Sequence, residues 1–286
     1  MHKNQITIKK KLVLDGLGLH SGVPVKLKFF PAEIDTGIVF LRTDIKKSEV
    51  IKSYWKNVIP SNLCTKISNN KNQSISTIEH LMFALYGLGI TNVHLEIDGP
   101  EVPILDGSAK IFIDELLKAG LVEQKKKNKI INILKKIELK ENNKSIRYQP
   151  TNEKFLELEY HLNYNDEFIK KQSFTLKNTE KNFTDISMCR TFCHQQDLEK
   201  IFAMGLAKGG SLDNAVVISG NKVLNQDGLR CPLEFVKHKI LDCLGDLYLS
   251  GFFITGKVIC NQGGHELTSK FLKKIFENGE NYSIIN

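Results

Sequence analysis

A helix with a row of polar side chains is the strongest constraint that the chain places on its fold. His238, Asp242 and Asp246 recur every four residues, so they line one side of that helix. An apolar stripe lies beside them and comprises Val236, Ile240, Cys243, Leu244 and Leu247. Because Phe235 and Leu249 fall on the polar flank, we expect the polar row to face more than plain solvent.

His238 and Asp242 predict half of a metal site. A neutral imidazole and a carboxylate one turn apart can bind the same divalent ion, as in helical zinc sites. A His-x-x-x-Asp pair alone is a weak signal, and an ordinary pair on a helix surface is the alternative. Two ligands leave a tetrahedral zinc short of at least one protein group, so a third must come from elsewhere in the chain.

The length of 286 residues suits one large domain or two of ordinary size, and 41% hydrophobic residues can fill their cores. No apolar run is long enough for a signal peptide or a membrane span, so we expect a cytoplasmic protein. The six cysteines include no Cys-x-x-Cys pair, and packing residues are expected rather than disulfides. A net charge of +8 suits an anionic partner.

Alternating apolar and polar residues predict strands in the first half over 5–14, 23–30, 37–42 and 93–97. Gly16, Gly18 and Gly22 lie between the first two strands and predict a glycine-rich turn. His20 lies in this turn, where a structural histidine is the favoured interpretation over a metal ligand.

Ser76 and Glu79 have the spacing of a capping box, which predicts a helix that continues to about Tyr86. His80 follows Glu79 directly. A purely structural interpretation of Glu79 remains open, because a glutamate at this position commonly folds back onto the cap.

A second helix is predicted from a cap at Ser108 to a stop at Gly120. The charged run 123–129 follows, and we expect it to be a linker between domains. The expected domains are therefore residues 1–125 and residues 129–286.

The second half begins again with strands, predicted over 129–139, 145–148, 155–164, 172–176, 215–219 and 254–260. A short helix is predicted over 197–204, and Gly220 and Asn221 predict a hairpin turn. The last helix is expected to begin at His265 and to reach about Glu277.

The two halves show a weak internal symmetry. Each presents strands, a helix that carries a histidine, a strand, a glycine turn and a closing helix. We therefore expect an α+β protein of two similar domains, each a β-sheet layer with helices, packed helix face to helix face. His80 and His238 then meet across the interface, where ligand sites tend to lie. The active site is expected there, and His80 supplies the missing ligand.

His80, His238 and Asp242 would form a site of two histidines and one carboxylate. Such a site leaves a position open for water, which is typical of catalytic rather than structural zinc.

Two further groups would complete a catalytic centre. Glu79 lies beside that water and is suited to act as general base. His265, if Asp246 holds it, is a candidate general acid, because the aspartate would favour its charged form. The metal site, the general base and the general acid together are suited to hydrolysis of an amide or an ester.

Several segments of the chain carry a resemblance to a known family: STIEHL at 76–81, DGSA at 106–109, RTF at 190–192, GGS at 209–211, LNQDGLR at 224–230 and EFVKHK at 234–239. In these segments the chain resembles the UDP-3-O-acyl-N-acetylglucosamine deacetylases, the zinc enzymes of lipid A synthesis. The likeness runs from GLGLHSG at 16–22 to His265 and so covers nearly the whole chain.

The resemblance implies a zinc metallo-amidase that removes the N-acetyl group from UDP-3-O-(3-hydroxyacyl)-N-acetylglucosamine and releases acetate. It implies that His80, His238 and Asp242 hold Zn2+ and that Glu79 activates water. The Thr191 hydroxyl would help to stabilise the tetrahedral oxyanion.

The remaining roles also follow from the resemblance. His265 with Asp246 would protonate the departing amine. Lys239 would contact the sugar and Phe192 would stack on it, while Lys144 and Tyr164 are candidates for the nucleotide end. The passage for the acyl chain would be lined by Leu19, Ile201, Leu206, Ser211, Leu212, Ala215 and Val217. An ordinary hydrophobic core is the alternative for this last set.

Two positions depart from the family pattern. Cys193 stands where a glycine usually follows Arg-Thr-Phe, which reduces backbone freedom beside Thr191. Gln262 stands where the family commonly places a lysine near the diphosphate, so one cationic contact to the substrate is in doubt.

Two other functions remain open from the residues alone. A different zinc amidohydrolase would act on another acylated amine, and the substrate-side motifs argue against it. A basic binder of nucleic acid or membrane surfaces would use lysine runs such as 125–127, which lack aromatic interleaving and a recognised motif. We expect a UDP-linked acylated sugar as partner, no nucleic acid, no integral membrane segment and at most a transient membrane-surface contact. We also expect a monomer.

Overall fold

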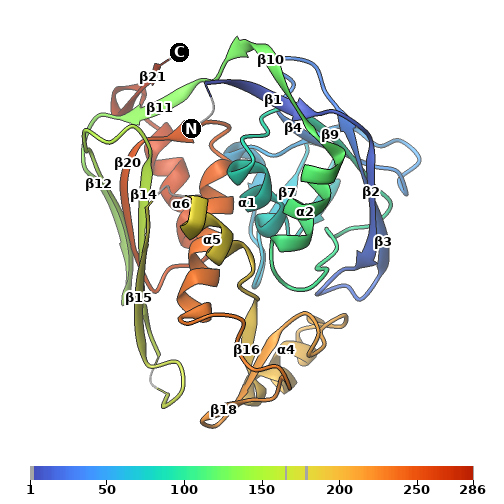
Figure 1. Cartoon of the computed structure of the whole chain (residues 1–286), viewed down its shortest axis with the longest axis vertical. Coiled ribbons are helices and arrows are strands. Elements are labelled where there is room, and N and C mark those ends of the chain that lie inside the picture. Colours follow the sequence, from blue (N-terminus) through green and yellow to red (C-terminus); the bar gives the residue numbers. More distant parts are fainter. Residues whose placement is uncertain (1–2, 165, 178–179, 286) are drawn as a thin grey trace.

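The computed structural model describes residues 3–164, 166–177 and 180–285. Two five-stranded sheets lie on opposite sides of a layer of helices (Figure 1). This arrangement confirms the α+β class. In the described part of the chain, no helix has both the length and the apolar character that a membrane crossing requires.

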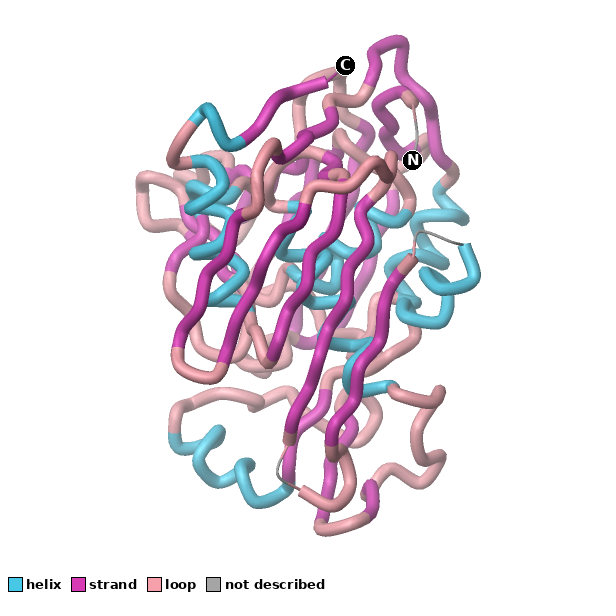
Figure 2. The backbone as a smooth tube through the Cα atoms, turned by 90° about the vertical axis from the view of Figure 1, so that its left-hand side faces the viewer, coloured by secondary structure: helices cyan, strands magenta, loops and turns pink. Residues whose placement is uncertain are grey.

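The two large sheets have the same strand order and the same strand directions. The first has the order β2 (Leu12–Leu17), β3 (Pro24–Pro31), β9 (Val93–Ile97), β4 (Ile38–Arg42) and β5 (Ile51–Lys52). The second, which faces the viewer in Figure 2, has the order β12 (Ile137–Glu141), β13 (Lys144–Gln149), β20 (Gly256–Asn261), β14 (Leu156–Asn163) and β15 (Lys171–Leu176). In each sheet the third and fourth strands are parallel and the other neighbours are antiparallel. The repeated topology supports the internal symmetry expected from the sequence.

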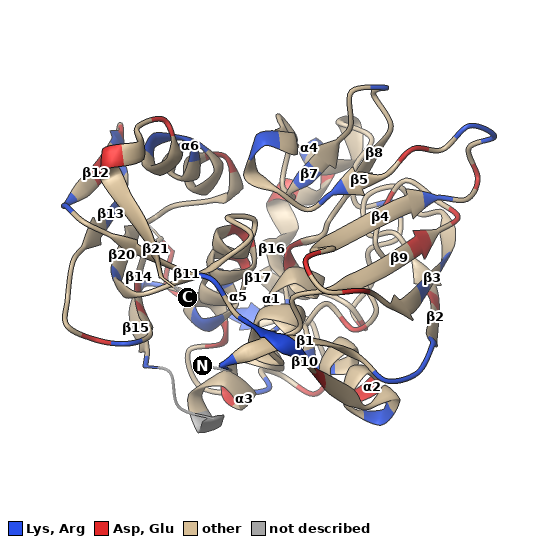
Figure 3. Ribbon diagram, turned by 90° about the horizontal axis from the view of Figure 1, so that it is seen from above, with Lys and Arg blue, Asp and Glu red and all other residues tan. Residues whose placement is uncertain are grey.

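The helices are α1 (Glu79–Gly87), α2 (Lys110–Ala119), α3 (Glu180–Ser187), α4 (Leu198–Ala203), α5 (Glu234–Tyr248) and α6 (His265–Phe276). Helix α1 precedes β9 and α5 precedes β20, so the two helices occupy equivalent places in the repeat. Both lie between the sheets (Figure 3). Every residue of α5 other than Lys239 is buried. The polar row of this helix therefore faces the interior of the protein.

Smaller elements complete the fold. One three-stranded sheet comprises β6 (Val58–Ile59), β7 (Lys66–Ser68) and β8 (Ser74–Ser76), and another comprises β16 (Phe192–His194), β17 (Val216–Ser219) and β18 (Lys222–Val223). A third comprises β19 (Phe253–Ile254), β11 (Ile130–Ile133) and β21 (Tyr282–Ile285). Short 3-10 turns lie at η1 (Trp55–Asn57), η2 (Gln195–Asp197) and η3 (Gly279–Asn281).

The prediction of a linker over 123–129 was wrong. Residues Leu121–Lys127 form strand β10, which pairs antiparallel with β1 (Asn4–Ile8). All residues of β10 are exposed or half-buried, so the strand has no buried apolar face by which its pairing could be predicted from the sequence. The division into residues 1–125 and 129–286 stays a prediction.

Three predicted strands are each two strands in the structure. The segment 5–14 divides into β1 and β2, which belong to different sheets. The segment 129–139 divides into β11 and β12, and the segment 254–260 into β19 and β20. Lys9, Lys10 and Lys11 interrupt the alternation at the first break, and Lys135 and Lys136 interrupt it at the second. Such a short polar gap does not reveal that the chain changes sheet.

Both predicted helix caps differ from the structure. Ile78 is the N-cap of α1, and no side chain caps this helix. Ala109 is the N-cap of α2, and Ser108 lies one residue earlier, where its hydroxyl accepts a hydrogen bond of 3.2 Å from the Lys110 amide. The capping-box prediction for Ser76 and Glu79 was therefore wrong.

Gly245 allows α1 and α5 to approach each other closely. A Cβ atom at this position would lie 2.1 Å from the Glu79 carbonyl oxygen and 3.2 Å from the Phe83 nitrogen. Real Cβ atoms do not approach backbone atoms so closely, so a side chain here would push the helices apart. Gly245 therefore fixes the distance between the helix that carries His80 and the helix that carries His238.

We expect Gly245→Ala to destabilise the protein by about 1 to 3 kcal/mol, the usual cost of overpacking. Alanine has a higher helix propensity than glycine, so helix propensity alone would make the variant more stable. A loss of stability would therefore come from packing. Denaturant unfolding measures the change. Gly279→Ala is the control, because a Cβ there has no heavy atom within 4 Å. Equal stability of the two variants would contradict the prediction.

Candidate metal centre and active site

Three predicted metal ligands meet between α1 and α5. His80 lies on α1, and His238 and Asp242 lie one turn apart on α5. The Asp242 Oδ1 atom is 3.5 Å from His80 Nε2 and 3.3 Å from His238 Nε2. One ligand atom from each residue falls within 4.8 Å of the others, and all three residues are buried. The geometry therefore matches a candidate metal site with two nitrogen donors and one oxygen donor.

The surroundings of His238 and Asp242 hold them in the forms that bind a metal. His238 Nδ1 lies 3.0 Å from the Cys189 carbonyl oxygen, so Nδ1–H donates to it and Nε2 is left as an acceptor. Burial lowers the pKa of His238 to about 3, which keeps the ring neutral. Burial alone would raise the pKa of Asp242, but His238 and Lys239 hold it well below its ordinary value.

Two buried atoms at this centre have no hydrogen-bond partner among the described residues: Asp242 Oδ1 and His80 Nδ1. A buried carboxylate oxygen without a partner is costly unless a cation lies beside it. Asp242 Oδ1 is also the oxygen that faces both histidines. The donor set and this oxygen together fit a divalent metal such as zinc.

Glu79 points its carboxylate toward the centre and does not cap α1. Its Oε2 accepts a hydrogen bond of 3.1 Å from the Thr65 amide, and its Oε1 lies 3.6 Å from His265 Nε2. The side chain is only 3% exposed. Burial raises its pKa, which is the direction that suits a general base at neutral pH. A structural role as a cap is therefore excluded for Glu79.

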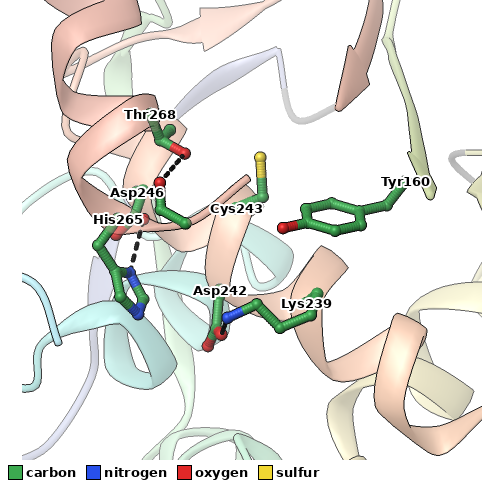
Figure 4. Close-up of a pocket in the computed structure, with 8 residues that line it drawn as sticks. Tyr160, Lys239, Asp242, Cys243, Asp246, His265 and Thr268 are labelled. Carbon is green, nitrogen blue, oxygen red and sulfur yellow. Dashed lines mark hydrogen bonds and ion pairs between the residues drawn. The ribbon is translucent and has the colours of Figure 1, made fainter. Parts of the chain in front are cut away.

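His265 is held by Asp246, as the sequence predicts. His265 Nδ1 lies 2.8 Å from Asp246 Oδ2, and Figure 4 shows the two side chains pointing toward each other in the lining of a pocket. Burial alone would lower the pKa of His265, but Asp246 and Glu79 raise it to about 9. The imidazole is thus protonated at neutral pH, as a general acid requires.

Thr65 is a residue of this centre that the sequence did not reveal. Its hydroxyl lies 2.5 Å from Asp246 Oδ1 and 3.0 Å from His265 Nδ1, while its amide donates to Glu79. It thus contacts both the expected base and the expected acid. Asp246 and His265 are 181 and 200 residues away in sequence, so no local pattern could have linked Thr65 to them.

Lys239 lies directly behind the metal ligands. Its Nζ donates a hydrogen bond of 2.6 Å to Asp242 Oδ2, the carboxylate oxygen that does not face the histidines (Figure 4). The ion pair with Asp242 raises the pKa of Lys239 despite burial of the ammonium group. Lys239 thus orients Asp242. Its predicted contact with the sugar stays a prediction.

Thr191 is held by its backbone on both sides. Its amide donates to the Gly107 carbonyl oxygen at 2.9 Å, and its carbonyl oxygen accepts from the Val216 amide at 2.8 Å. Among the described residues its half-buried hydroxyl has no hydrogen-bond partner, which leaves it free to donate to a substrate.

Phe192 and Tyr164 lie together beside the centre. The Phe192 ring centroid is 6.2 Å from that of His238 and also 6.2 Å from that of Tyr164. Tyr164 is 38% exposed, so its ring is accessible. The structure thus brings both predicted sugar and nucleotide contacts to one side of the metal ligands.

The residues expected to line an acyl passage differ in exposure. Ala215 and Val217 are buried, Leu19, Ile201 and Leu206 are half-buried, and Ser211 and Leu212 are exposed. The Gly209 amide donates to the Leu19 carbonyl oxygen at 3.0 Å, which places Leu19 against the loop before Ser211. Assignment of the whole set to a core is wrong, because a core would cover Ser211 and Leu212.

The more distant candidates also have definite places. Lys144 is exposed at the start of β13. The side-chain amide of Gln262 donates to the Asn163 carbonyl oxygen and accepts a hydrogen bond of 2.9 Å from Asn143. Cys193 lies in strand β16, whose extended backbone any residue can adopt, so a glycine is not required there.

Comparison with known proteins shows a similarity that covers nearly the whole chain. Residues 5–277 match the family model LpxC, UDP-3-O-acyl N-acetylglycosamine deacetylase. A UDP-3-O-acyl-N-acetylglucosamine deacetylase of Mannheimia succiniciproducens is 41% identical over 284 residues, 98% of this chain and 92% of the relative. The enzymes of the same name from Campylobacter fetus and Haemophilus influenzae are 41% and 39% identical, each over 98% of this chain and over 94% and 92% of the relative.

Proposed function

The chain belongs to the UDP-3-O-acyl-N-acetylglucosamine deacetylase family, and from this premise we propose how its residues carry out the reaction. It is a deacetylase of lipid A biosynthesis. The proposed substrate is UDP-3-O-(3-hydroxyacyl)-N-acetylglucosamine, and acetate is the proposed product. The observation that carries the proposal is the buried cluster of His80, His238 and Asp242, with Glu79 and His265 beside it.

We propose zinc as the metal that His80, His238 and Asp242 hold. Bound zinc would supply a Lewis acid and lower the pKa of a water molecule. Lys239 keeps Asp242 ionised and turned toward the two histidines. The Cys189 carbonyl oxygen keeps His238 in the tautomer that offers Nε2.

In the proposed mechanism Glu79 accepts the proton of the attacking water. The Thr65 amide fixes the carboxylate through Oε2 and leaves Oε1 for this proton. The Thr191 hydroxyl donates to the oxyanion that develops on the acetyl carbonyl group. His265, protonated and held by Asp246, donates a proton to the departing amine.

We also propose the substrate contacts that the family resemblance implies. Phe192 stacks on the sugar, Lys239 contacts it, and Tyr164 lies toward the nucleotide together with Lys144. The acyl chain passes Leu19, Leu206, Ser211 and Ala215. Lys and Arg are spread over strands, helices and loops and mixed with Asp and Glu (Figure 3). A nucleic-acid-binding protein usually clusters its Lys and Arg on one face, so this distribution does not favour that function. A cytoplasmic location and a monomeric state stay predictions.

Release of acetate from the UDP-linked acylated N-acetylglucosamine tests the function directly. We expect zinc-loaded protein to release one acetate for each substrate consumed and to lose this activity with a chelator. Release from an acylated amine without the UDP group at an equal rate would favour a different zinc amidohydrolase. Substrates with different acyl chains then test the passage.

The rate of deacetylation should fall as the pH rises through about 9, where His265 loses its proton. Asp246→Asn removes the negative charge that raises this pKa, so the alkaline limb should move to lower pH and turnover should fall. Rate profiles of both proteins measure the shift. Because a metal-bound water can also titrate, His265→Ala must be compared.

Asp227→Asn is the control for the charge change, because Asp227 is exposed. It should leave the alkaline limb in place. An unmoved limb in Asp246→Asn and His265→Ala, with little loss of rate, would disprove the acid role of His265.

A further inference from the structure

Cys189 and Cys231 form a thiol pair near the metal ligands. Their sulfur atoms are 3.3 Å apart, although the residues are 42 positions apart in sequence. Cys189 is buried, whereas Cys231 is only half-buried and can be reached from solvent. The Cys189 thiol also donates a hydrogen bond of 3.2 Å to the Asp185 carbonyl oxygen.

One buried carboxylate holds the backbone beside both cysteines. Glu234 accepts from the amide of Arg190, the residue after Cys189, at 3.0 Å. It also accepts from the amide of Arg230, the residue before Cys231, at 2.7 Å. Glu234 is fully buried, and the Arg190 guanidinium group is paired with it. The two sulfur atoms are therefore kept together by contacts that do not depend on a bond between them.

The surroundings of Cys231 favour its reactive form. Lys237 places its ammonium group 3.7 Å from the Cys231 sulfur atom. The contact with the Cys189 sulfur atom and the charge of Lys237 lower the pKa of Cys231 to about 7. A free cysteine has a pKa of about 8.5, so the thiolate fraction of Cys231 at neutral pH is raised.

The pair is linked to a proposed metal ligand through the backbone. The Cys189 carbonyl oxygen accepts the hydrogen bond from His238 Nδ1. Such outer contacts orient a ligating histidine, and their loss typically costs about 10- to 100-fold in metal affinity or activity. A displacement of Cys189 therefore reaches the metal ligands in one step.

We propose that Cys189 and Cys231 are a site of reversible thiol oxidation, at which a peroxide forms a disulfide that disturbs His238. The Cys231 thiolate attacks one peroxide oxygen, the O–O bond breaks, and a sulfenic acid forms with release of hydroxide. The Cys189 sulfur then attacks the sulfenic sulfur, and the departing hydroxide takes the Cys189 proton as water. With hydrogen peroxide, two thiols lose two electrons and the peroxide is reduced to two waters.

Bond formation must shorten the distance between the sulfur atoms from 3.3 Å to about 2 Å. In our proposal the accompanying shift of Cys189 moves its carbonyl oxygen away from His238 Nδ1. Disulfides in a reducing compartment are usually transient and redox-sensing, which fits a bond that thiols reverse. Formation of the Cys189–Cys231 disulfide does not depend on the proposed deacetylase function. The effect of the disulfide on turnover rests on that function, because it acts through His238.

The experiment treats the zinc-loaded full chain with hydrogen peroxide, quenches with catalase and divides the sample. Peptide mapping should find a Cys189–Cys231 cross-link with loss of two hydrogen atoms per chain. Deacetylation should fall by at least about tenfold and return after dithiothreitol. Cys231→Ser should give no cross-link and should resist this reversible loss.

Cys193→Ser is the matched control, because Cys193 is also half-buried but has no thiol partner among the described residues. It should form the cross-link as the unchanged chain does. Oxidation of Cys231 without a cross-link to Cys189 would overturn the proposal, and so would a cross-link that leaves turnover unchanged. A chain that forms the cross-link but has no activity even when reduced would instead count against the proposed function.

Discussion

His80→Ala should remove bound metal and deacetylation together while the fold is kept. The substitution deletes one of three donors that lie within 4.8 Å of one another, and two remaining donors cannot hold a tetrahedral metal tightly. The fold should be kept, because His80 Nδ1 has no hydrogen-bond partner among the described residues. The substitution therefore leaves no buried group without its partner at that atom. We expect a loss of metal affinity above the roughly 100-fold that removal of an outer contact costs.

His238→Ala and Asp242→Ala should lose metal and activity in the same way. Asp242→Ala should also be less stable, because it leaves the Lys239 ammonium group without its partner. Elemental analysis after dialysis measures metal content, and circular dichroism measures the fold. His94→Ala is the control, since His94 is exposed on β9. Full metal content in any of the three variants would remove that residue from the ligand set.

Glu79→Gln should keep the metal and lose most of the turnover. The amide oxygen can still accept the hydrogen bond from Thr65, so the side chain should keep its place. The glutamine amide cannot take a proton from water, and general base catalysis typically raises the reaction rate by about 10²- to 10⁴-fold. We therefore expect turnover to fall by about that factor, with metal content and melting temperature close to those of the unchanged chain.

Glu266→Gln is the matched control for this substitution. Glu266 is a neighbour of His265 in sequence, but its side chain is 75% exposed and pairs with Lys270 on the surface of α6. The same chemical change there should have little effect on turnover. Near-normal activity in Glu79→Gln would show that this carboxylate is not the base. Loss of metal in that variant would show that it helps to hold the ion.

Features that depend on neighbouring residues could be predicted from the amino-acid sequence. The spacing of His238, Asp242 and Asp246 requires a helix that presents them on one side, and the structure places them on α5. Strand β9 is another case, because its apolar and polar residues alternate along one exposed and one buried face. The match between the two halves also predicted the approach of His80 to His238, because equivalent helices of a repeat can pack together.

Features that depend on contacts between distant segments could be found only in the folded protein. A glutamate three residues after a serine predicts a cap, yet Glu79 turns to the amide of Thr65 because the loop that contains Thr65 packs beside α1. The charged run 123–129 looked like a linker, but the backbone of Leu121–Lys127 pairs with β1 near the N-terminus. Strand pairing uses backbone groups that every residue has, so the side chains of β10 gave no sign of it.

The candidate site shows the same division. The sequence contained its donors, its base and its acid as residue types at suggestive spacings. The structure added Thr65, which contacts both Glu79 and Asp246, the latter 181 residues away from it in sequence. It also added the sulfur pair of Cys189 and Cys231. The spacing of side chains along a helix or strand follows from backbone geometry, so it can be recognised in a short stretch of sequence. Contacts between remote residues arise only when packing fixes how far each segment lies from the next, as Gly245 does for α1 and α5.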